Sequence, residues 1–216
     1  PVKGVLPAVL AAASQGWPAV VVPIENLAEA SLVDGIEVWG VRSLTQLHAW
    51  LTGKGDLDGR VESPQHTPEL VTDLSDVVGQ TPARYAVEVA AAGAHNLLMT
   101  GPPGVGKTML AQRLPGLLPP LSPAESLEVT AIHSVAGVLT GDAPLITRPP
   151  FVAPHHTASV AALVGGGAGM ARPGALSRAH RGVLFLDEFA EINSANEILG
   201  DKEKRAEAGK YPDPLV

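Results

Sequence analysis

The sequence predicts an α/β protein made of two successive units. Helical and extended patterns alternate over residues 1–52, as they do in α/β and α+β domains. Residues 53–72 are rich in glycine, proline and charge, which is typical of a linker. Alternation resumes over residues 73–192, around a glycine-rich turn that joins an apolar strand to a helix. Residues 193–216 are dense in charge and poor in apolar side chains, so we expect a poorly ordered tail.

Composition narrows the class of protein. Hydrophobic residues make up 45% of the 216 residues but aromatic residues only 4%, so the core is expected to consist of alanine, valine and leucine. A net charge of −7 argues against a basic nucleic-acid surface over the whole chain. The absence of cysteine excludes disulfides, zinc–thiolate sites and thiol nucleophiles. With no signal peptide and no apolar run of about 18 residues, we expect a cytoplasmic protein without membrane contact.

The first unit contains three predicted helices and two predicted strands. "VLPAVLAAASQG" predicts a helix that ends at Gly16, and "PAVVVP" a short buried strand. "NLAEASLVDG" predicts a helix capped by Asn26, followed by the strand "IEVWGV". "SLTQLHAWLTG" predicts a helix between the N-cap Ser43 and Gly53.

The second unit continues the alternation. "TPARYAVEVAAAGAH" predicts a helix with Thr81 as its N-cap and Pro82 at its first position. The strand "NLLMT" follows, and then a helix, "GKTMLAQRLPGLLPPL", that Pro115 interrupts. A further helix is expected at about residues 122–131. A glycine-rich loop, "GGGAGMARPG", then precedes the strand "GVLFL".

A phosphate-binding pattern lies between the strand "NLLM" and the helix "KTMLAQRL". "GPPGVGKT" fits G-x-x-x-x-G-K-[ST], whose glycines let backbone N–H groups turn toward phosphate oxygens. Lys107 supplies a positive charge for the β- and γ-phosphates, and the Thr108 hydroxyl is a ligand for Mg²⁺. The predicted nucleotide-binding residues are Gly101, Pro102, Pro103, Gly104, Val105, Gly106, Lys107 and Thr108.

Two acids follow the second apolar strand, in "GVLFLDE". Buried strands rarely end in unpaired charge, so a functional partner is expected. In a phosphate-loop protein, an acid in this position holds Mg²⁺, directly or through water, which is the role we predict for Asp187. Glu188 is then predicted to orient and deprotonate the attacking water. ATP and Mg²⁺ are therefore the expected cofactors, and Glu188 and Lys107 the expected catalytic residues.

Several segments in order resemble one family. "DLSDVVGQTPARYAVEVAAAGAHNLLMTGPPGVGKTMLAQRLPGLLPPLSPAESLEVTAIHSVAG", "RPPFVAPHHTASVAALVGGG" and "RPGALSRAHRGVLFLDE" resemble the Mg-chelatase-related AAA+ ATPases of the ComM/YifB type. The resemblance implies a P-loop core of three αβα layers. It also implies a hexameric ring with ATP between subunits, and ATP hydrolysis coupled to DNA branch migration or helicase activity in recombination or natural transformation.

The resemblance also assigns segments. "DVVGQ", residues 76–80, is similar to the stretch near the adenine. Residues 165–174 resemble an insertion that reaches toward the ring pore, with Arg172 and Arg178 as nearby cations for DNA. Residues 1–52 resemble the end of a Lon-protease-like α+β domain, of the ribosomal protein S5 domain 2-like fold. The position similar to the Lon catalytic lysine is Leu6, and Lys3 lies three residues early, so a non-proteolytic role is expected.

Other polar and aromatic residues receive structural interpretations. His155 and His156 are adjacent, so on a strand they would point to opposite faces and could not easily share a metal ion. A hydrogen-bonding or structural role is expected for both. Trp17, Trp39 and Trp50 all fall in the first unit and are expected to serve core or domain packing.

After residue 192 the family pattern stops. No sensor strand, helical lid or arginine finger is recognisable there, and Arg205 is the only arginine in this stretch. Because such a finger is worth roughly 10³–10⁵ in rate, turnover by this chain alone is left open. The expectation is a truncated or frame-altered family member. Two alternatives stand beside the DNA motor: a non-catalytic nucleotide-binding fragment and a magnesium-chelatase motor subunit.

Overall fold

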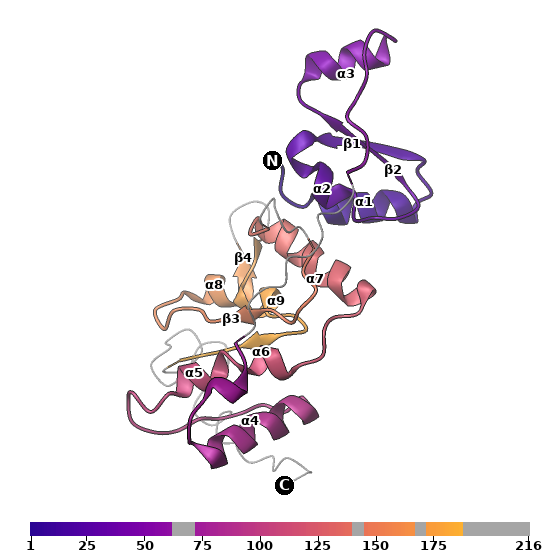
Figure 1. Cartoon of the computed structure of the whole chain (residues 1–216). Coiled ribbons are helices and arrows are strands. Elements are labelled where there is room, and N and C mark those ends of the chain that lie inside the picture. Colours follow the sequence, from indigo (N-terminus) through magenta and orange to yellow (C-terminus); the bar gives the residue numbers. More distant parts are fainter. Residues whose placement is uncertain (62–71, 140–144, 167–171, 188–216) are drawn as a thin grey trace.

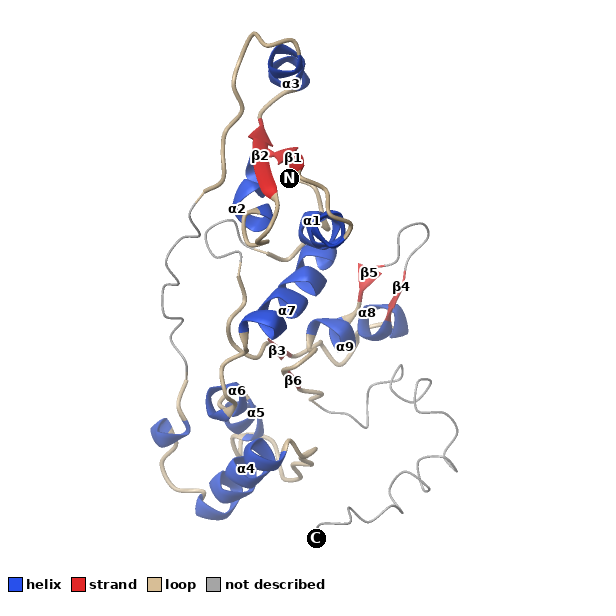
Figure 2. Ribbon diagram, turned by 90° about the vertical axis from the view of Figure 1, so that its right-hand side faces the viewer, coloured by secondary structure: helices blue, strands red, loops and turns tan. Residues whose placement is uncertain are grey.

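The computed structural model describes residues 1–61, 72–139, 145–166 and 172–187, which form a mixed α/β fold (Figure 1). Two regions follow each other along the length of the molecule (Figures 1 and 2). We call residues 1–61 the N-terminal unit and the described part of residues 72–187 the core unit. The predicted tail, residues 193–216, and the predicted base Glu188 lie outside the described residues.

The N-terminal unit has the predicted order of helices and strands. Its elements are α1 (Val5–Ser14), β1 (Ala19–Pro23), the 3-10 helix η1 (Ile24–Asn26), α2 (Leu27–Ala30), β2 (Glu37–Val41) and α3 (Leu44–Leu51). The strands β1 and β2 pair in parallel, with Ala19 opposite Glu37 and Pro23 opposite Val41. A parallel pair needs a crossover connection, and η1 and α2 supply it here.

The core of the N-terminal unit is aliphatic, as the composition predicts. Leu6 of α1 and Ala30 of α2 have no exposed surface, and Val22 and Val38 of the two strands are buried with them. Leu127 and Ala131, which belong to a helix of the core unit, pack against the same cluster. The two units therefore share part of one hydrophobic core.

Three expectations about single residues in this unit have different outcomes. Ser43 is confirmed as an N-cap, because its hydroxyl accepts the Gln46 N–H at 3.1 Å. Asn26 is not a side-chain cap: its amide group bonds to the backbone N–H and C=O of Val2, each at 2.8 Å. Core packing is wrong for Trp17 and Trp50, which are 59% and 37% exposed.

The core unit consists of short elements. They are η2 (Leu74–Asp76), α4 (Thr81–Gly93), α5 (Lys107–Ala111), α6 (Leu114–Leu117), α7 (Pro123–Ala136), β3 (Phe151–Val152), α8 (Val160–Val164), β4 (Gly165–Gly166), β5 (Arg172–Pro173), α9 (Ala175–Arg178) and β6 (Val183–Leu184). β3 and β6 pair in parallel, whereas β4 and β5 form an antiparallel pair. The helix α7 bridges the two units, since it packs against α1 on one side and α9 on the other (Figure 2).

Helix ends in this unit differ from the predictions in detail. The N-cap of α4 is Gln80, in a left-handed conformation with φ 50°, rather than Thr81. The predicted helix is interrupted, as expected, but the break falls at residues 112 and 113, and Pro115 lies in the first turn of α6, where a proline is tolerated. The helix expected at residues 122–131 runs over Pro123–Ala136, and Ser122 and Glu125 form its capping box.

The segment "NLLMT" is neither helical nor paired as a strand, so this prediction is wrong for the described residues. Its side chains still alternate in the manner of a strand. Leu97 and Met99 pack against the cluster that includes Val87 and Leu110, while Leu98 is 83% exposed. A ladder needs a neighbouring strand, and none of the strands in the described ranges pairs with this segment. In the same ranges, no helix has the length and apolar character needed to cross a membrane.

Candidate nucleotide-binding site

The candidate site is built on the turn that follows "NLLMT". Residues 101–106 form this turn, and α5 starts directly after it at Lys107. Gly101, Gly104 and Gly106 have φ angles of 153°, 81° and 88°. L-amino acids with a side chain rarely adopt such angles, so the backbone itself requires the glycine spacing of the motif.

One side of the turn is bordered by the segment before α4. A Cβ placed on Gly106 would lie 3.1 Å from Nε2 of Gln80 and 3.1 Å from Cε of Met109. At Gly104, by contrast, such an atom would meet nothing within 4 Å. The structure therefore brings the end of "DVVGQ" next to the glycine-rich turn, with open space over its middle.

The Lys107 side chain folds back over the turn. Its ammonium donates to the carbonyl oxygen of Gly101 at 2.7 Å and to that of Pro102 at 3.1 Å. A lysine ammonium carries three donors, so these two bonds hold its charge at the mouth of the turn. An anion bound there would replace the two carbonyls as acceptors.

The fold brings Thr108 and Asp187 together. The Thr108 hydroxyl donates to the Asp187 carboxylate at 3.4 Å, although 79 residues separate them in the sequence. Both residues are exposed. A hydroxyl and a carboxylate are hard oxygen donors, which is the chemistry that Mg²⁺ prefers, and the turn is shaped by glycines that leave room for phosphate. The residues present thus fit a magnesium–nucleotide complex.

An arginine outside the sequence motifs supports the helix that follows the turn. Arg113, between α5 and α6, donates from Nε to the Asp73 carbonyl at 3.1 Å and from Nη1 to the Met109 carbonyl at 2.9 Å. The Asp73 carboxylate accepts the Ser75 N–H at 2.7 Å, and this backbone hydrogen bond lowers the pKa of Asp73. These contacts tie η2 to the helix that follows the turn. The only feature of the sequence that could have indicated this role is that Arg113 is a single cation inside the largely apolar run "MLAQRLPGLL".

A second arginine supports the strand that leads to Asp187. Arg181 has φ 57° and bonds through Nε to Glu128 and through Nη1 to Glu125, both at 2.6 Å. The bond from Arg181 lowers the pKa of Glu128, and His180, at 3.1 Å, acts in the same direction. For Glu125 the main cause of the lowered pKa is the backbone N–H of Ser122. α7 therefore holds the backbone just before β6.

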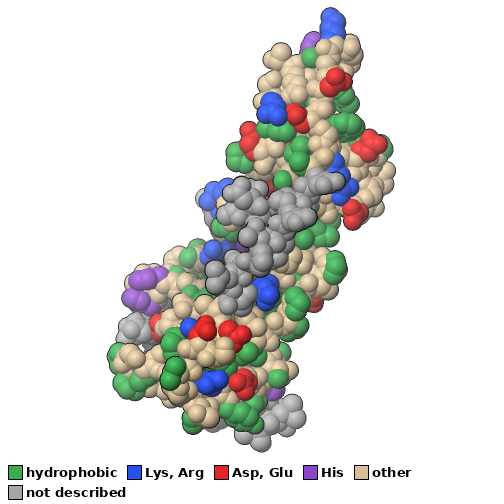
Figure 3. Space-filling model, in the orientation of Figure 1, with side chains coloured by type: hydrophobic (Ala, Val, Ile, Leu, Met, Phe, Trp, Pro, Cys, Tyr) green, Lys and Arg blue, Asp and Glu red, His purple; other side chains and the backbone are tan. Residues whose placement is uncertain are grey.

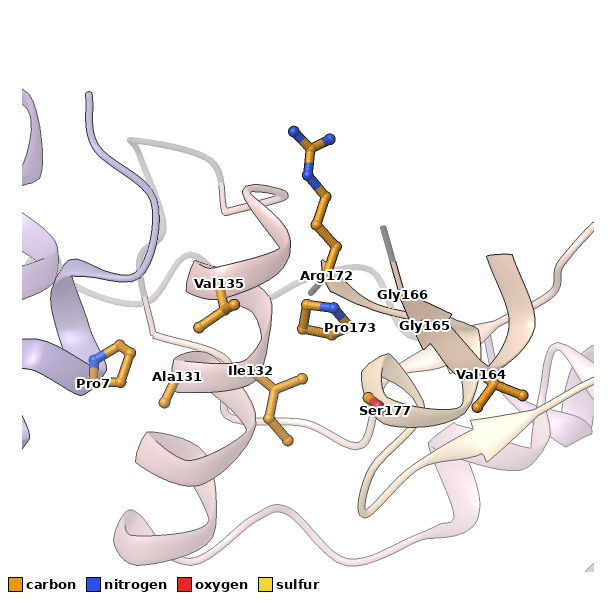
Figure 4. Close-up of a pocket in the computed structure, with 10 residues that line it drawn as sticks. All are labelled: Pro7, Ala131, Ile132, Val135, Val164, Gly165, Gly166, Arg172, Pro173 and Ser177. Carbon is orange, nitrogen blue, oxygen red and sulfur yellow. The ribbon is translucent and has the colours of Figure 1, made fainter. Parts of the chain in front are cut away.

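The glycine-rich segment forms a narrow hairpin away from the turn. β4 and β5 approach so closely that a Cβ on Gly174 would lie 2.4 Å from the Gly165 nitrogen and 2.4 Å from the Leu163 oxygen. Arg172 stands at the rim of an apolar cleft of about 590 Å³, which Pro7 of α1, α7 and the hairpin line (Figure 4). Arg172 belongs to β5 and Arg178 to the last turn of α9, where its carbonyl lies 2.9 Å from Nε2 of His133 on α7. Residues 167–171 of this segment lie outside the described residues.

The two adjacent histidines lie in a turn and not on a strand. Their ring centroids are 4.1 Å apart, so the expectation that they point to opposite faces is wrong. Nδ1 of His155 lies 2.8 Å from the Thr157 hydroxyl, in agreement with a hydrogen-bonding role. Within the described ranges, no group of three or more acids and histidines is arranged to hold a metal ion.

Leu6 occupies the position similar to the Lon lysine, and its side chain is fully buried. Its N–H donates to the Glu29 carboxylate at 3.0 Å. The Lys3 side chain lies over Gly137, where a Cβ would come within 2.8 Å of Nζ. Leu6 has no amine, and the Lys3 amine belongs to an exposed residue, so neither provides the enclosed lysine of a Lon-type site.

These features together define the class of protein: the mixed α/β fold and the glycine-rich turn beside an acid are those of the Mg-chelatase-like AAA+ ATPase family. The chain belongs to this family, since the family model described as magnesium chelatase, subunit ChlI, matches residues 73–200. More particularly, it is a protein of the ComM/YifB type.

Three relatives support the assignment to the ComM/YifB type. The chain is 76% identical over 200 residues to the uncharacterized protein Rv2897c of Mycobacterium tuberculosis, covering 92% of this chain and 40% of the relative. It is 45% identical over 173 residues to the uncharacterized protein YifB of Salmonella typhimurium, with 80% and 34% covered. It is 39% identical over 214 residues to the competence protein ComM of Haemophilus influenzae, with 97% and 41% covered.

A weaker similarity reaches the Lon protease 2 of Bacillus subtilis, at 29% identity over 154 residues, which covers 64% of this chain and 27% of that protein. The chain thus spans about two fifths or less of the length of the relatives that it matches.

Proposed function

We propose that residues 101–108 bind ATP and that Thr108 and Asp187 hold its Mg²⁺. The observation that carries this proposal is the 3.4 Å approach of the Thr108 hydroxyl to the Asp187 carboxylate, at the start of the helix that follows the glycine-rich turn. Backbone N–H groups of the turn would meet the phosphates, and Gln80 would border the nucleotide. When bound, Mg²⁺ neutralises phosphate charge and polarises the phosphoryl oxygens.

In the proposed reaction, Lys107 exchanges its two carbonyl acceptors for phosphate oxygens and stabilises the negative charge of the transferred group. Glu188, which lies outside the described residues, is proposed as the base that orients and deprotonates the attacking water. The chemistry is hydrolysis of the terminal phosphate of ATP, and we propose that it takes place in a P-loop AAA+ core of three αβα layers.

We further propose that this hydrolysis drives DNA remodelling by a homo-oligomeric, hexameric ring. The support is the family membership and the similarity to a competence protein. On the face that Figure 3 shows, lysines and arginines are interspersed with acids and form no continuous basic track among the described residues. DNA contact is therefore proposed to be local, through Arg172 and Arg178 near the hairpin. The N-terminal unit is proposed to be a Lon-like remnant without protease chemistry, because Leu6 offers no base.

The test compares wild type with Lys107→Ala and Glu188→Gln. ATP affinity and phosphate release are measured with and without single-stranded or branched DNA. We expect Lys107→Ala to lose ATP binding, and Glu188→Gln to bind ATP but hydrolyse it much more slowly. Lys54→Ala, which removes an exposed lysine outside the core unit, is the matched control. Equal rates in wild type and Glu188→Gln would refute the proposed base.

The same experiment separates the alternatives. Turnover that DNA stimulates and that Lys107→Ala abolishes supports the DNA motor. ATP binding without turnover under any condition supports a non-catalytic nucleotide-binding fragment. The family model's description, magnesium chelatase subunit ChlI, favours a second candidate, the chelatase motor, which would turn over ATP without a response to DNA.

A further inference from the structure

A buried carboxylate lies at the boundary between the two units, and the proposed reaction does not use it. Glu29 of α2 is 9% exposed. It accepts the Leu6 N–H at 3.0 Å, the Asn26 amide at 3.1 Å and the hydroxyl of Ser134 on α7. Among the described residues it forms no ion pair with a cation. A buried carboxylate without a cation depends on hydrogen-bond donors, so loss of any one of them is costly.

α7 presents two opposite faces to its surroundings. Leu127, Ala131 and Ser134 follow the i, i+4, i+7 spacing of one face, and this face meets the N-terminal unit. A second hydrogen bond joins this face to the N-terminal unit, because the Gly4 N–H donates to the Ser134 carbonyl at 3.2 Å. α1 and α7 pack against each other, but next to Pro7 they border an apolar cleft (Figure 4). The polar contacts of Ser134 therefore add to the apolar packing of Leu127 and Ala131 in joining α7 to the N-terminal unit.

The other face of α7 holds the chain that leads to Asp187. Glu125 and Glu128 bind Arg181, as described above, and Nε2 of His133 lies 2.9 Å from the Arg178 carbonyl. Arg181 is followed at once by β6. There the Val183 N–H bonds to the Pro150 carbonyl at 2.8 Å and the Phe185 N–H to the Val152 carbonyl at 2.9 Å. The backbone at residues 178–181 thus takes its position from α7, and residues 183–185, which follow two residues later, pair with β3.

We propose that Glu29 is a positioning residue for the metal side of the nucleotide site. By holding Ser134 it fixes α7 against the N-terminal unit, and α7 in turn fixes residues 178–181, from which the chain runs through β6 to the Asp187 carboxylate. A helix moves as a rigid element, so a shift at Ser134 displaces Glu125 and Glu128 as well. Only the last step, from Asp187 to Mg²⁺, depends on the proposed function.

The first test needs no nucleotide. Amide hydrogen exchange is measured on the whole chain for wild type, Glu29→Gln and Ser134→Ala. Gln keeps the shape of Glu29 but turns an acceptor oxygen into an NH₂ group that faces donors, and Ser134→Ala is the milder change. We expect exchange at Val183 and Phe185 to become about fivefold faster in both variants, which is the effect of one hydrogen bond lost.

Glu25→Gln is the matched control, since Glu25 is an exposed acid on the same connection, in η1. It should leave exchange at Val183 and Phe185 unchanged. Faster exchange confined to α1 and α2 in both test variants would overturn the proposal. If Glu29→Gln does not fold, Ser134→Ala alone decides, because it only removes a hydroxyl.

The second test addresses the metal. We expect the Mg²⁺ concentration that gives half-maximal ATP turnover to rise about threefold or more in Glu29→Gln and Ser134→Ala, while ATP affinity without Mg²⁺ stays the same. A merely structural role would lower the folded fraction and kcat but leave this midpoint in place, and that result would overturn the proposal. If wild type neither binds nor hydrolyses ATP, the proposed function fails, and hydrogen exchange still decides whether Glu29 positions the chain that leads to Asp187.

Discussion

The Thr108 hydroxyl lies 3.4 Å from the Asp187 carboxylate, across 79 residues of sequence. Thr108 reaches this place because α5 begins directly after the glycine-rich turn, and Asp187 because β6 pairs with β3. Each residue lies in a motif that local sequence identifies, but only the tertiary fold brings the two side chains together. The pair is the basis for the first prediction.

Thr108→Ala should raise the Mg²⁺ concentration needed for half-maximal ATP binding by roughly tenfold or more, since even residues that only support a metal ligand contribute 10- to 100-fold. Thr108→Ser keeps the hydroxyl and should stay near wild type. The measurement is a Mg²⁺ titration of ATP binding. If Thr108→Ala and Thr108→Ser have equal midpoints, the hydroxyl is not a ligand.

The Glu128–Arg181 pair predicts an acid-sensitive contribution to stability. The bond from Arg181 lowers the pKa of Glu128 below its ordinary value of 4.5 in the folded protein. The stabilisation is therefore fully present above pH 4.5 and is lost as the pH falls through the lower, folded pKa. Thermal melts from pH 6 to pH 3 should show a smaller fall in Tm for Glu128→Gln than for wild type.

Glu25→Gln removes an exposed carboxylate that has no hydrogen bond or ion pair in the described part of the chain, and it should follow the wild-type curve. A Glu128→Gln protein whose Tm falls as steeply as that of wild type would contradict the assigned role of the pair. Asp73 and Glu125 contribute to the rest of the fall in the wild-type Tm, because separate backbone hydrogen bonds lower their pKa values.

Gly174→Ala should destabilise the core unit by about 1–3 kcal/mol, the usual cost of an added atom where packing leaves no space. The new Cβ would lie 2.4 Å from the backbone of Gly165 and Leu163, and backbone cannot move aside as a flexible side chain can. Gly59→Ala is the control, because its Cβ would meet only Trp39, at 3.7 Å. Urea unfolding compares the two, and equal stabilities would rule out the close approach.

Leu6→Ala should cost about 2–5 kcal/mol, because the Leu6 side chain is fully buried in the core that the two units share. Leu44→Ala removes the same atoms from a side chain that is 84% exposed, so its effect should stay within about 0.5 kcal/mol. Chemical denaturation measures both. If Leu6→Ala is as mild as Leu44→Ala, the interpretation of this position as core rather than catalytic loses its basis.

Sequence patterns predicted most elements because their signals are local. The N-cap of α3 and the order of helices and strands up to residue 51 depend only on neighbouring residues. "NLLMT" was predicted as a strand from its composition, but pairing depends on a neighbour that local sequence does not specify. Asn26 has a capping residue type, yet its amide is engaged by the distant Val2.

The sequence by itself determined the phosphate-binding turn, because the backbone angles at Gly101, Gly104 and Gly106 require glycine at that spacing. It also determined the absence of thiol chemistry. The tertiary structure decided what surrounds the turn: Asp187 beside Thr108, Arg181 held by α7, and Glu29 buried against Ser134. These contacts join residues 53 to 105 positions apart, and long-range packing, which no local pattern encodes, brings them together.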